Sequence, residues 1–233
     1  ISSLRSIKDD EELETIQKAI NIADNSFNAI SENIKPGDTE KEIAWELEKH
    51  IRMQGAESLS FETIVASGPN SAKPHHSPSN RKIREGEPIV IDMGAKFSGY
   101  CSDLTRTICI GKPDEKYNKI YDTVFIAQLT AIETLEEGMT GKGIDNLARS
   151  IITDSGFGDN FGHSLGHGVG LEVHENPGVG PTSENIIEEN MVFTVEPGIY
   201  IENWGGVRIE DIVSIKNGET KIMSNAKKNK ILD

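Results

Sequence analysis

The sequence predicts an α+β fold made of two similar halves, in each of which two helices are followed by an antiparallel hairpin. Three observations lead to this prediction. Helical periodicity alternates with apolar, strand-like runs, a set of residues recurs 101 positions later in the chain, and the hairpins of both halves carry acidic residues at matched places. The 233 residues are expected to form a single domain, residues 1–233.

Four helices are expected from the 3.6-residue spacing of apolar side chains and from capping residues at their starts. The first carries apolar residues from Ile16 to Ile30 behind a cap pair formed by Asp9 and Glu12. The first helix is predicted over residues 9–30, and the second begins at the Thr39–Glu42 capping box. The third is predicted from Pro113 through Leu135, and the fourth over residues 143–153. Strands are predicted over residues 62–66, 88–95, 100–110, 169–173, 191–201 and 207–215.

An internal repeat connects the two halves. The segment PGDTEKEI at residues 36–43, followed by Gly55, resembles EGMTGKGI at residues 137–144, followed by Gly156. Each copy is followed by a loop that contains histidine and then by an acidic hairpin, EGEPIVIDMGA in the first half and EENMVFTVEPG in the second. We interpret residues 9–110 and 114–215, approximately, as duplicated half-domains that pack about a pseudo-two-fold axis.

Both hairpins place carboxylates where a core strand would avoid them. If Ala95 pairs with Tyr100 across the loop KFSG, Asp92 falls opposite Asp103, with Cβ atoms roughly 5 Å apart. In the second hairpin Glu196 and Glu210 lie symmetrically about Asn203. Four carboxylates would then face each other across the pseudo-two-fold axis.

Such a cluster within apolar strands costs several kcal/mol unless the acids are protonated or matched by cations. A solvated sheet face is the simpler explanation for a single strand acid, but four matched positions favour metal binding. Two divalent metals with a bridging hydroxide would nearly balance the four charges, so the pattern predicts a two-metal hydrolytic site.

The histidines add candidate ligands. The segment GHSLGHGVGLEVHE places His163, His167 and His174 in a glycine-rich run, where the backbone can approach other groups closely. We expect one of them to bind metal and the others to handle protons or substrate. The GHGVG stretch lacks the spacing of a dinucleotide-binding loop.

These residues, in this order, resemble a known family. Five of them match the metal-ligand positions of the pita-bread metallopeptidases over essentially the whole chain: Asp92, Asp103 in DLTRT, His167 in GHGVG, Glu196 in VEPG and Glu210 in VRIED. The resemblance implies a curved antiparallel sheet with helices outside. It also implies a dinuclear site in which Asp92 and Asp103 bind one metal and His167 the other, with both glutamates shared. Manganese suits this oxygen-rich set best, and cobalt, zinc or iron are alternatives.

The motifs TIVASGPNSAKPHH, IDMGA, HSLGHGVGLEVHE and GVRIEDIV are similar to those of the Xaa-Pro dipeptidase (prolidase) and aminopeptidase P branch. Members of that branch hydrolyse the bond before proline, so the implied substrate is a dipeptide or short peptide with proline in second position. The alternatives are a methionine aminopeptidase-like enzyme and a noncatalytic peptide-binding module of the same fold.

The resemblance also implies roles for the remaining site residues. Glu196 is expected to accept the proton of the attacking water and to help deliver it to the leaving proline nitrogen. His75 and His174 are expected to border the substrate and steady the tetrahedral intermediate. His163 lines the pocket or is only a packing residue, and His76 is expected to be the solvent-exposed neighbour of His75. Arg208 either holds the carboxylates, which we favour, or contacts the substrate carboxylate.

The branch commonly carries an additional N-terminal domain. This chain begins at ISSLRSIKDDEELETIQKA, where the catalytic domain of the branch would start. We therefore expect the chain to lack that domain, either as a fragment or as a naturally short form. Because the additional domain often shapes the dimer in this branch, a homodimer is one of the assemblies compatible with the sequence.

Overall fold

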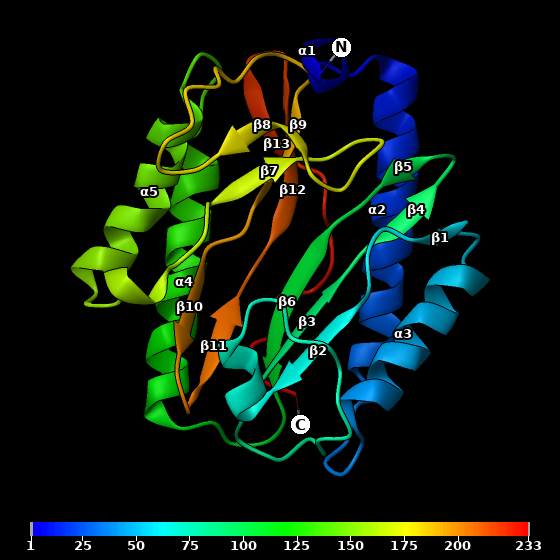
Figure 1. The fold of residues 1–233 in the computed structure, drawn as a ribbon, viewed down its shortest axis with the longest axis vertical. Coiled ribbons are helices and arrows are strands. Elements are labelled where there is room, and N and C mark those ends of the chain that lie inside the picture. Colours follow the sequence, from blue (N-terminus) through cyan, green and yellow to red (C-terminus); the bar gives the residue numbers. More distant parts are fainter. Residues whose placement is uncertain (1, 233) are drawn as a thin grey trace.

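A computed structural model describes residues 2–232 of the chain and shows strands at the centre with helices outside them (Figure 1). Two long helices cover one side and two cover the other. The helices are α1 (Ser2–Ser6), α2 (Asp10–Ser31), α3 (Glu40–Met53), α4 (Glu115–Thr134) and α5 (Gly141–Asp154), with short 3₁₀ turns η1 (Gly68–Ala72) and η2 (Gly158–Asn160). The four predicted helices are confirmed, and the single turn α1 was not predicted.

The helix starts follow the predicted capping chemistry. Asp9 and Glu12 form a reciprocal capping box at α2, and Thr39 and Glu42 form another at α3. These pairs satisfy amide groups that would otherwise lack partners in the first helical turn. Among the described residues, no helix is long and apolar enough to cross a membrane.

Between residues 2 and 232 the strands form antiparallel sheets that do not close into a barrel. One sheet has the order β2 (Ile64–Ser67), β3 (Pro88–Met93), β6 (Leu104–Cys109), and a second has the order β1 (Ser58–Leu59), β4 (Ala95–Phe97), β5 (Tyr100–Cys101). The largest sheet has the order β13 (Glu219–Ile222), β12 (Asp211–Lys216), β9 (Val192–Val195), β7 (Gly166–Gly168), β8 (Glu175–Val179). A separate two-stranded sheet pairs β10 (Gly198–Ile201) with β11 (Gly205–Arg208).

The predicted register of the first hairpin is wrong by two residues. The structure pairs Phe97 with Tyr100, so the loop is the two-residue turn Ser98–Gly99, with φ of 48° and 85°. Asp92 consequently lies opposite Thr105 rather than opposite Asp103. A shift by two residues keeps the same side chains on the same face, so both aspartates still reach one side of the sheet.

The second hairpin has the predicted register. Gly198 pairs with Arg208 and Val195 with Asp211, so the strands are symmetric about Asn203, as expected. Both cysteines, Cys101 and Cys109, are free and buried.

The strand predicted over residues 169–173 is wrong, because the strand is β7 and the following residues form a loop. A Cβ on Gly166 would lie 1.9 Å from the carbonyl oxygen of Thr194, and one on Gly168 would lie 2.2 Å from that of Asn176. Only glycine lets this backbone fit between β8 and β9. Strands β1, β8 and β13 were not predicted, and β8 contains proline and glycine, which are rare in strands.

The hydrophobic core lies between the helices and the sheets in both halves. One cluster packs α4 and α5 against β9, β11 and β12, and another packs α2 and α3 against β2, β3 and β6. The two halves also begin alike: Gly37 donates its amide to the carbonyl of Ile83, and Gly138, 101 positions later, donates to that of Ile187. We retain the duplication, and the single domain over residues 1–233, as proposals.

Candidate metal centre

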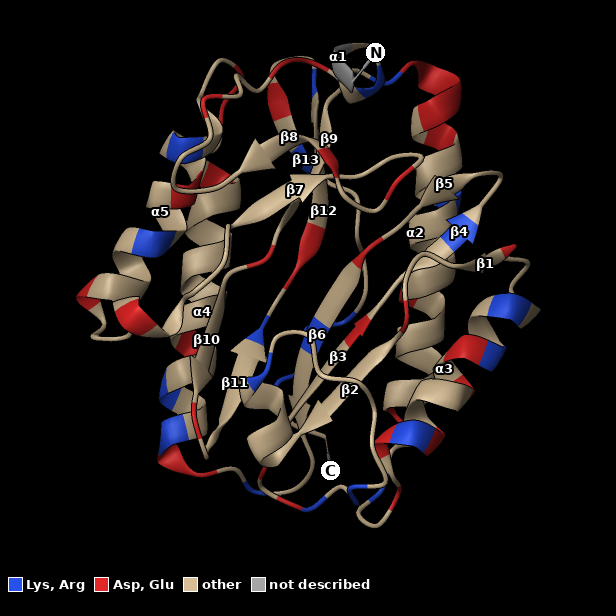
Figure 2. Cartoon of the chain, viewed as in Figure 1, with Lys and Arg blue, Asp and Glu red and all other residues tan. Residues whose placement is uncertain are grey.

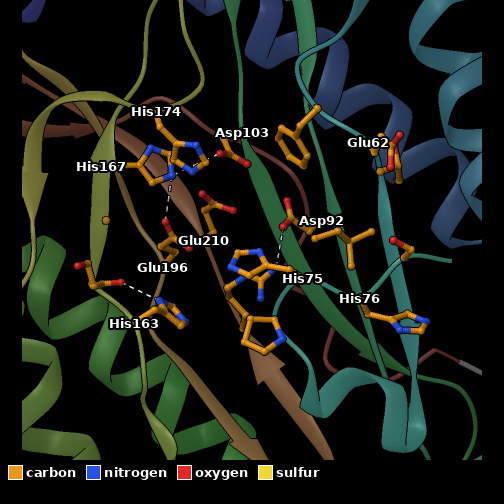
Figure 3. A pocket seen from close by; sticks show the side chains of 18 of the residues that line it. Glu62, His75, His76, Asp92, Asp103, His163, His167, His174, Glu196 and Glu210 are labelled. Carbon is orange, nitrogen blue, oxygen red and sulfur yellow. Dashed lines mark hydrogen bonds and ion pairs between the residues drawn. The ribbon is translucent and has the colours of Figure 1, made fainter.

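The predicted site residues meet in one cavity of about 620 Å³ between the two halves (Figure 3). Its lining comes from β3, β7, the strand ends of both hairpins and the loop after η1. All nine sequence-predicted site residues line it: His75, Asp92, Asp103, His163, His167, His174, Glu196, Arg208 and Glu210.

The acids sit on or beside interruptions of the strands. Asp92 lies near the end of β3, whereas Asp103, Glu196 and Glu210 lie in the short breaks between successive strands. In these breaks the backbone forms other hydrogen bonds, such as that from the amide of Glu210 to the carbonyl of Thr105 at 3.1 Å. Figure 2 shows acidic positions on the central strands as well as on the outer helices.

Three side chains offer ligand atoms close enough to share one ion. The carboxylates of Asp103 and Glu210 and the imidazole of His167 place one atom each within 4.8 Å of the others. The Nε2 atom of His167 lies 3.2 Å from Oε1 of Glu196 and 3.6 Å from Oδ2 of Asp103. Four of the five predicted ligands are therefore linked through short distances.

Asp92, the fifth predicted ligand, contacts Arg208. The guanidinium donates from Nη2 to Oδ2 of Asp92 at 2.6 Å and from Nη1 to the hydroxyl of Tyr200 at 2.8 Å. Arg208 is only 4% exposed, so this ion pair is buried. Arg208 therefore contacts one of the predicted metal ligands directly, and its role at the site stays a prediction.

Two buried carboxylate oxygens in the cavity have no hydrogen-bond partner, namely Oδ1 of Asp92 and Oε1 of Glu210. Buried polar atoms without partners are rare in folded proteins and cost free energy. Hard divalent cations prefer carboxylate oxygens, and imidazole is a common additional ligand. The residues present therefore fit a divalent metal centre.

The electrostatics of the cluster lead to the same conclusion. Burial, followed by the charges of neighbouring acids, raises the pKa of Asp103 and of Glu210 well above the usual range. Burial also raises the pKa of Asp92, although Arg208 opposes the shift. Burial acts in the same direction on Glu196, but the hydrogen bond and charge of His167, together with the charges of His163 and Arg208, outweigh it and lower the pKa to about 2. Additional positive charge would stabilise the ionised cluster.

The remaining histidines surround the cluster in different ways. The ring of His174 packs against that of His167, with centroids 4.1 Å apart. His163 places Nε2 2.9 Å from the hydroxyl of Tyr200, and burial lowers its pKa. His75 is exposed on the cavity wall. His76 does not remain a solvent-exposed neighbour, because it turns toward the buried carboxylate of Glu40, 2.9 Å away.

Sequence reasoning missed several polar side chains that support the acids. The hydroxyl of Thr105 donates to Oε2 of Glu210 at 2.6 Å, and that of Thr194 donates to Oε1 of Glu196 at 3.1 Å. Tyr200 connects His163 with Arg208. The sequence did contain a signal for the two threonines, because residues two apart on a strand point to the same face. Thr105 follows Asp103 by two residues, and Thr194 precedes Glu196 by two.

Comparisons with known proteins agree with this site. The model of metallopeptidase family M24 matches residues 14–217. A Xaa-Pro dipeptidase of Pyrococcus furiosus is 49% identical over 223 residues, which is 95% of this chain and 64% of that protein. A solved Xaa-Pro dipeptidase from Bacillus anthracis superposes with a TM-score of 0.97 at 45% identity, covering 100% of this chain and 65% of the other.

A solved X-Pro aminopeptidase from Thermotoga maritima superposes with a TM-score of 0.95 at 43% identity, covering 99% of this chain and 65% of the other. The expected α+β, pita-bread fold is confirmed by these structures. The chain spans a little under two thirds of the length of the relatives it matches.

Proposed function

The chain belongs to metallopeptidase family M24, and from this premise we propose that it hydrolyses the N-terminal Xaa-Pro bond of dipeptides or short peptides. The observation that carries the proposal is the cavity in which five matched ligand residues meet, with two buried carboxylate oxygens that have no partner. The names of the similar proteins, Xaa-Pro dipeptidase and X-Pro aminopeptidase, support the choice of substrate.

We assign the metal ligands to the residues predicted from the sequence: Asp92, Asp103, His167, Glu196 and Glu210. Two divalent ions held there would lower the pKa of a water molecule and stabilise negative charge on the scissile carbonyl. Manganese is the proposed metal, because the set contains four carboxylates and a single imidazole. Cobalt, zinc and iron are the alternatives.

The chain's own groups have distinct roles in this proposal. Glu196, which is ionised at neutral pH, accepts the proton of the attacking water and later returns it to the leaving proline nitrogen. His75 and His174 line the cavity from two different loops, and we assign both to the substrate. Arg208 fixes Asp92 through their buried ion pair, and His163 acts on Arg208 through Tyr200.

The test is turnover by protein that has been stripped of metal and reloaded with manganese, cobalt or zinc. The substrates are a Xaa-Pro dipeptide, a Xaa-Pro tripeptide and a Met-Ala peptide. We expect hydrolysis of at least one proline substrate, and the ratio of the first two separates dipeptidase from aminopeptidase P activity. Turnover of Met-Ala alone would assign a methionine aminopeptidase-like activity, and metal binding without turnover would assign a noncatalytic role.

Two further parts of the proposal concern the protein in its cell. We place it in the cytoplasm, since both buried cysteines are free. A homodimer stays a prediction, which light scattering coupled to size exclusion would test through the mass of the particle.

A further inference from the structure

A single carboxylate outside the cavity accepts hydrogen bonds from several parts of the loop that carries His75. Glu40, in the first turn of α3, is 0% exposed. Ser67 donates to its Oε1 atom from both the amide and the hydroxyl at 2.8 Å, and Ser79 donates to Oε2 from the amide at 3.0 Å and the hydroxyl at 2.6 Å. Asn70 adds its side-chain amide at 3.0 Å.

These donors span the whole loop. Ser67 ends β2, Asn70 lies in η1, and Ser79 is near the start of the return to β3, so both ends and the middle of residues 67–79 converge on one side chain. His76 completes the set with Nε2 2.9 Å from Oε2 of Glu40. Its neighbour His75 lies on the cavity side of the loop (Figure 3).

We propose that Glu40 and His76 are positioning residues for His75, which they hold against the cavity by fixing the loop from behind. The side chain of His76 is 12% exposed and pairs with Glu40, whereas His75 is exposed on the cavity wall. The inference rests on the proposed function in one respect, namely that His75 contacts the substrate.

The chemistry of the anchor requires a carboxylate. The groups from Ser67, Asn70 and Ser79 that face Glu40 all donate hydrogen bonds, so an acceptor-only side chain fits them best. Burial by itself would raise the pKa of Glu40, but the hydrogen bonds from Ser79, Asn70 and His76 outweigh it and lower the pKa to about 2. Glutamine would turn an amino group toward some of these donors and leave buried groups unpaired.

The internal repeat shows that this anchor belongs to one half only. Position 141 corresponds to Glu40 in the repeat and is occupied by glycine. A Cβ on Gly141 would lie 2.2 Å from the carbonyl oxygen of Gly178, so the second half has no space for a side chain there. The carboxylate thus occurs in the half whose loop carries His75.

The decisive experiment compares Glu40→Gln in two backgrounds. In the otherwise native chain loaded with manganese, kcat for a Xaa-Pro substrate should fall at least about tenfold while the bound metal per chain stays unchanged. In a His75→Ala background, the same substitution should change kcat less than about twofold, because a residue that acts through His75 has nothing left to position. Equal losses in both backgrounds, or loss of metal, would overturn the proposal.

A matched control is Glu42→Gln on the same helix. Glu42 is exposed, and its carboxylate accepts hydrogen bonds from Thr39 rather than from the loop. It should keep kcat within about twofold of the native value, since Glu42 contacts only the start of the helix and not the loop. A loss as large as that of Glu40→Gln would assign the effect to the helix start and not to the loop.

Hydrogen exchange provides a readout that needs no turnover. The amides of Ser67 and Ser79 donate directly to Glu40, so peptides covering residues 67–79 should exchange at least about tenfold faster in Glu40→Gln. Peptides from β6 should not change. Unchanged exchange in the loop would refute the anchor. A native chain without turnover would refute the proposed function instead, and the exchange result would still decide whether Glu40 holds this segment.

Discussion

Replacing Arg208 with methionine tests the electrostatic account of the cavity most simply. Arg208 is 4% exposed and lies 2.6 Å from Asp92, and the substitution removes the charge while keeping a side chain of similar length. Removing one partner of a buried ion pair typically costs about 3–5 kcal/mol, because the other charge stays buried. In a chain of this size, each kcal/mol shifts the melting temperature by about 2–4 °C, so the expected drop is about 6–20 °C.

The assay is thermal unfolding in chelator, followed by circular dichroism, with Arg52→Met as the control. Arg52 pairs with Glu48 at 2.9 Å, but their side chains are 51% and 30% exposed. Exposed pairs contribute only about 0–1 kcal/mol, so this control should lower the melting temperature by at most about 4 °C. If Arg208→Met behaved like the control, the buried pair would not be stabilising Asp92 and the reasoning would fail.

Three other predictions address the ligands, the histidines and an acid outside the cavity. Asp103→Asn keeps the shape of the side chain but removes a charge, so metal occupancy and turnover should fall together; elemental analysis that found two metals per chain with native turnover would refute the assignment. His174→Ala should retain its metals and lose roughly 10²-fold in kcat, whereas His167→Ala should lose metal first and recover partly in excess manganese; the reverse pattern would exchange the two roles. The pKa of Glu40 is lowered from 4.5 to about 2, so its ionised form stabilises the folded state above pH 4.5 and this contribution is lost as pH falls toward 2. Urea unfolding of the native chain should show that the free energy of unfolding falls with pH in this range, and Glu40→Gln should lack the part due to Glu40, on the order of 3 kcal/mol. The same pH dependence of the unfolding free energy in both proteins would contradict the pKa shift.

The features that could be predicted from the sequence depend on local chemistry. Capping pairs such as Asp9 with Glu12 located the helix starts, since their hydrogen bonds join residues three positions apart. The register of the second hairpin followed from the symmetric placement of Glu196 and Glu210. All nine predicted site residues line one cavity, because the strands and loops that carry them converge there.

The errors arose where distant contacts or turn geometry decide the structure. The first hairpin turns at Ser98–Gly99, and a sequence pattern with several candidate turn residues did not distinguish this turn from a longer loop. Strand β7 depends on the close approach of Gly166 to β9, which no local pattern encodes. The role of Glu40 was missed for the same reason, since its partners follow it by 27 to 39 residues.

The central claim is that this chain holds two divalent ions and needs them to hydrolyse a Xaa-Pro bond. The most direct test titrates stripped protein with manganese and measures both bound metal per chain and turnover of a Xaa-Pro dipeptide and tripeptide in the same samples. The account predicts saturation at two ions per chain, with turnover that appears as the metals bind. Full turnover in chelator, or saturation at two ions with no hydrolysis of either proline substrate, would contradict it.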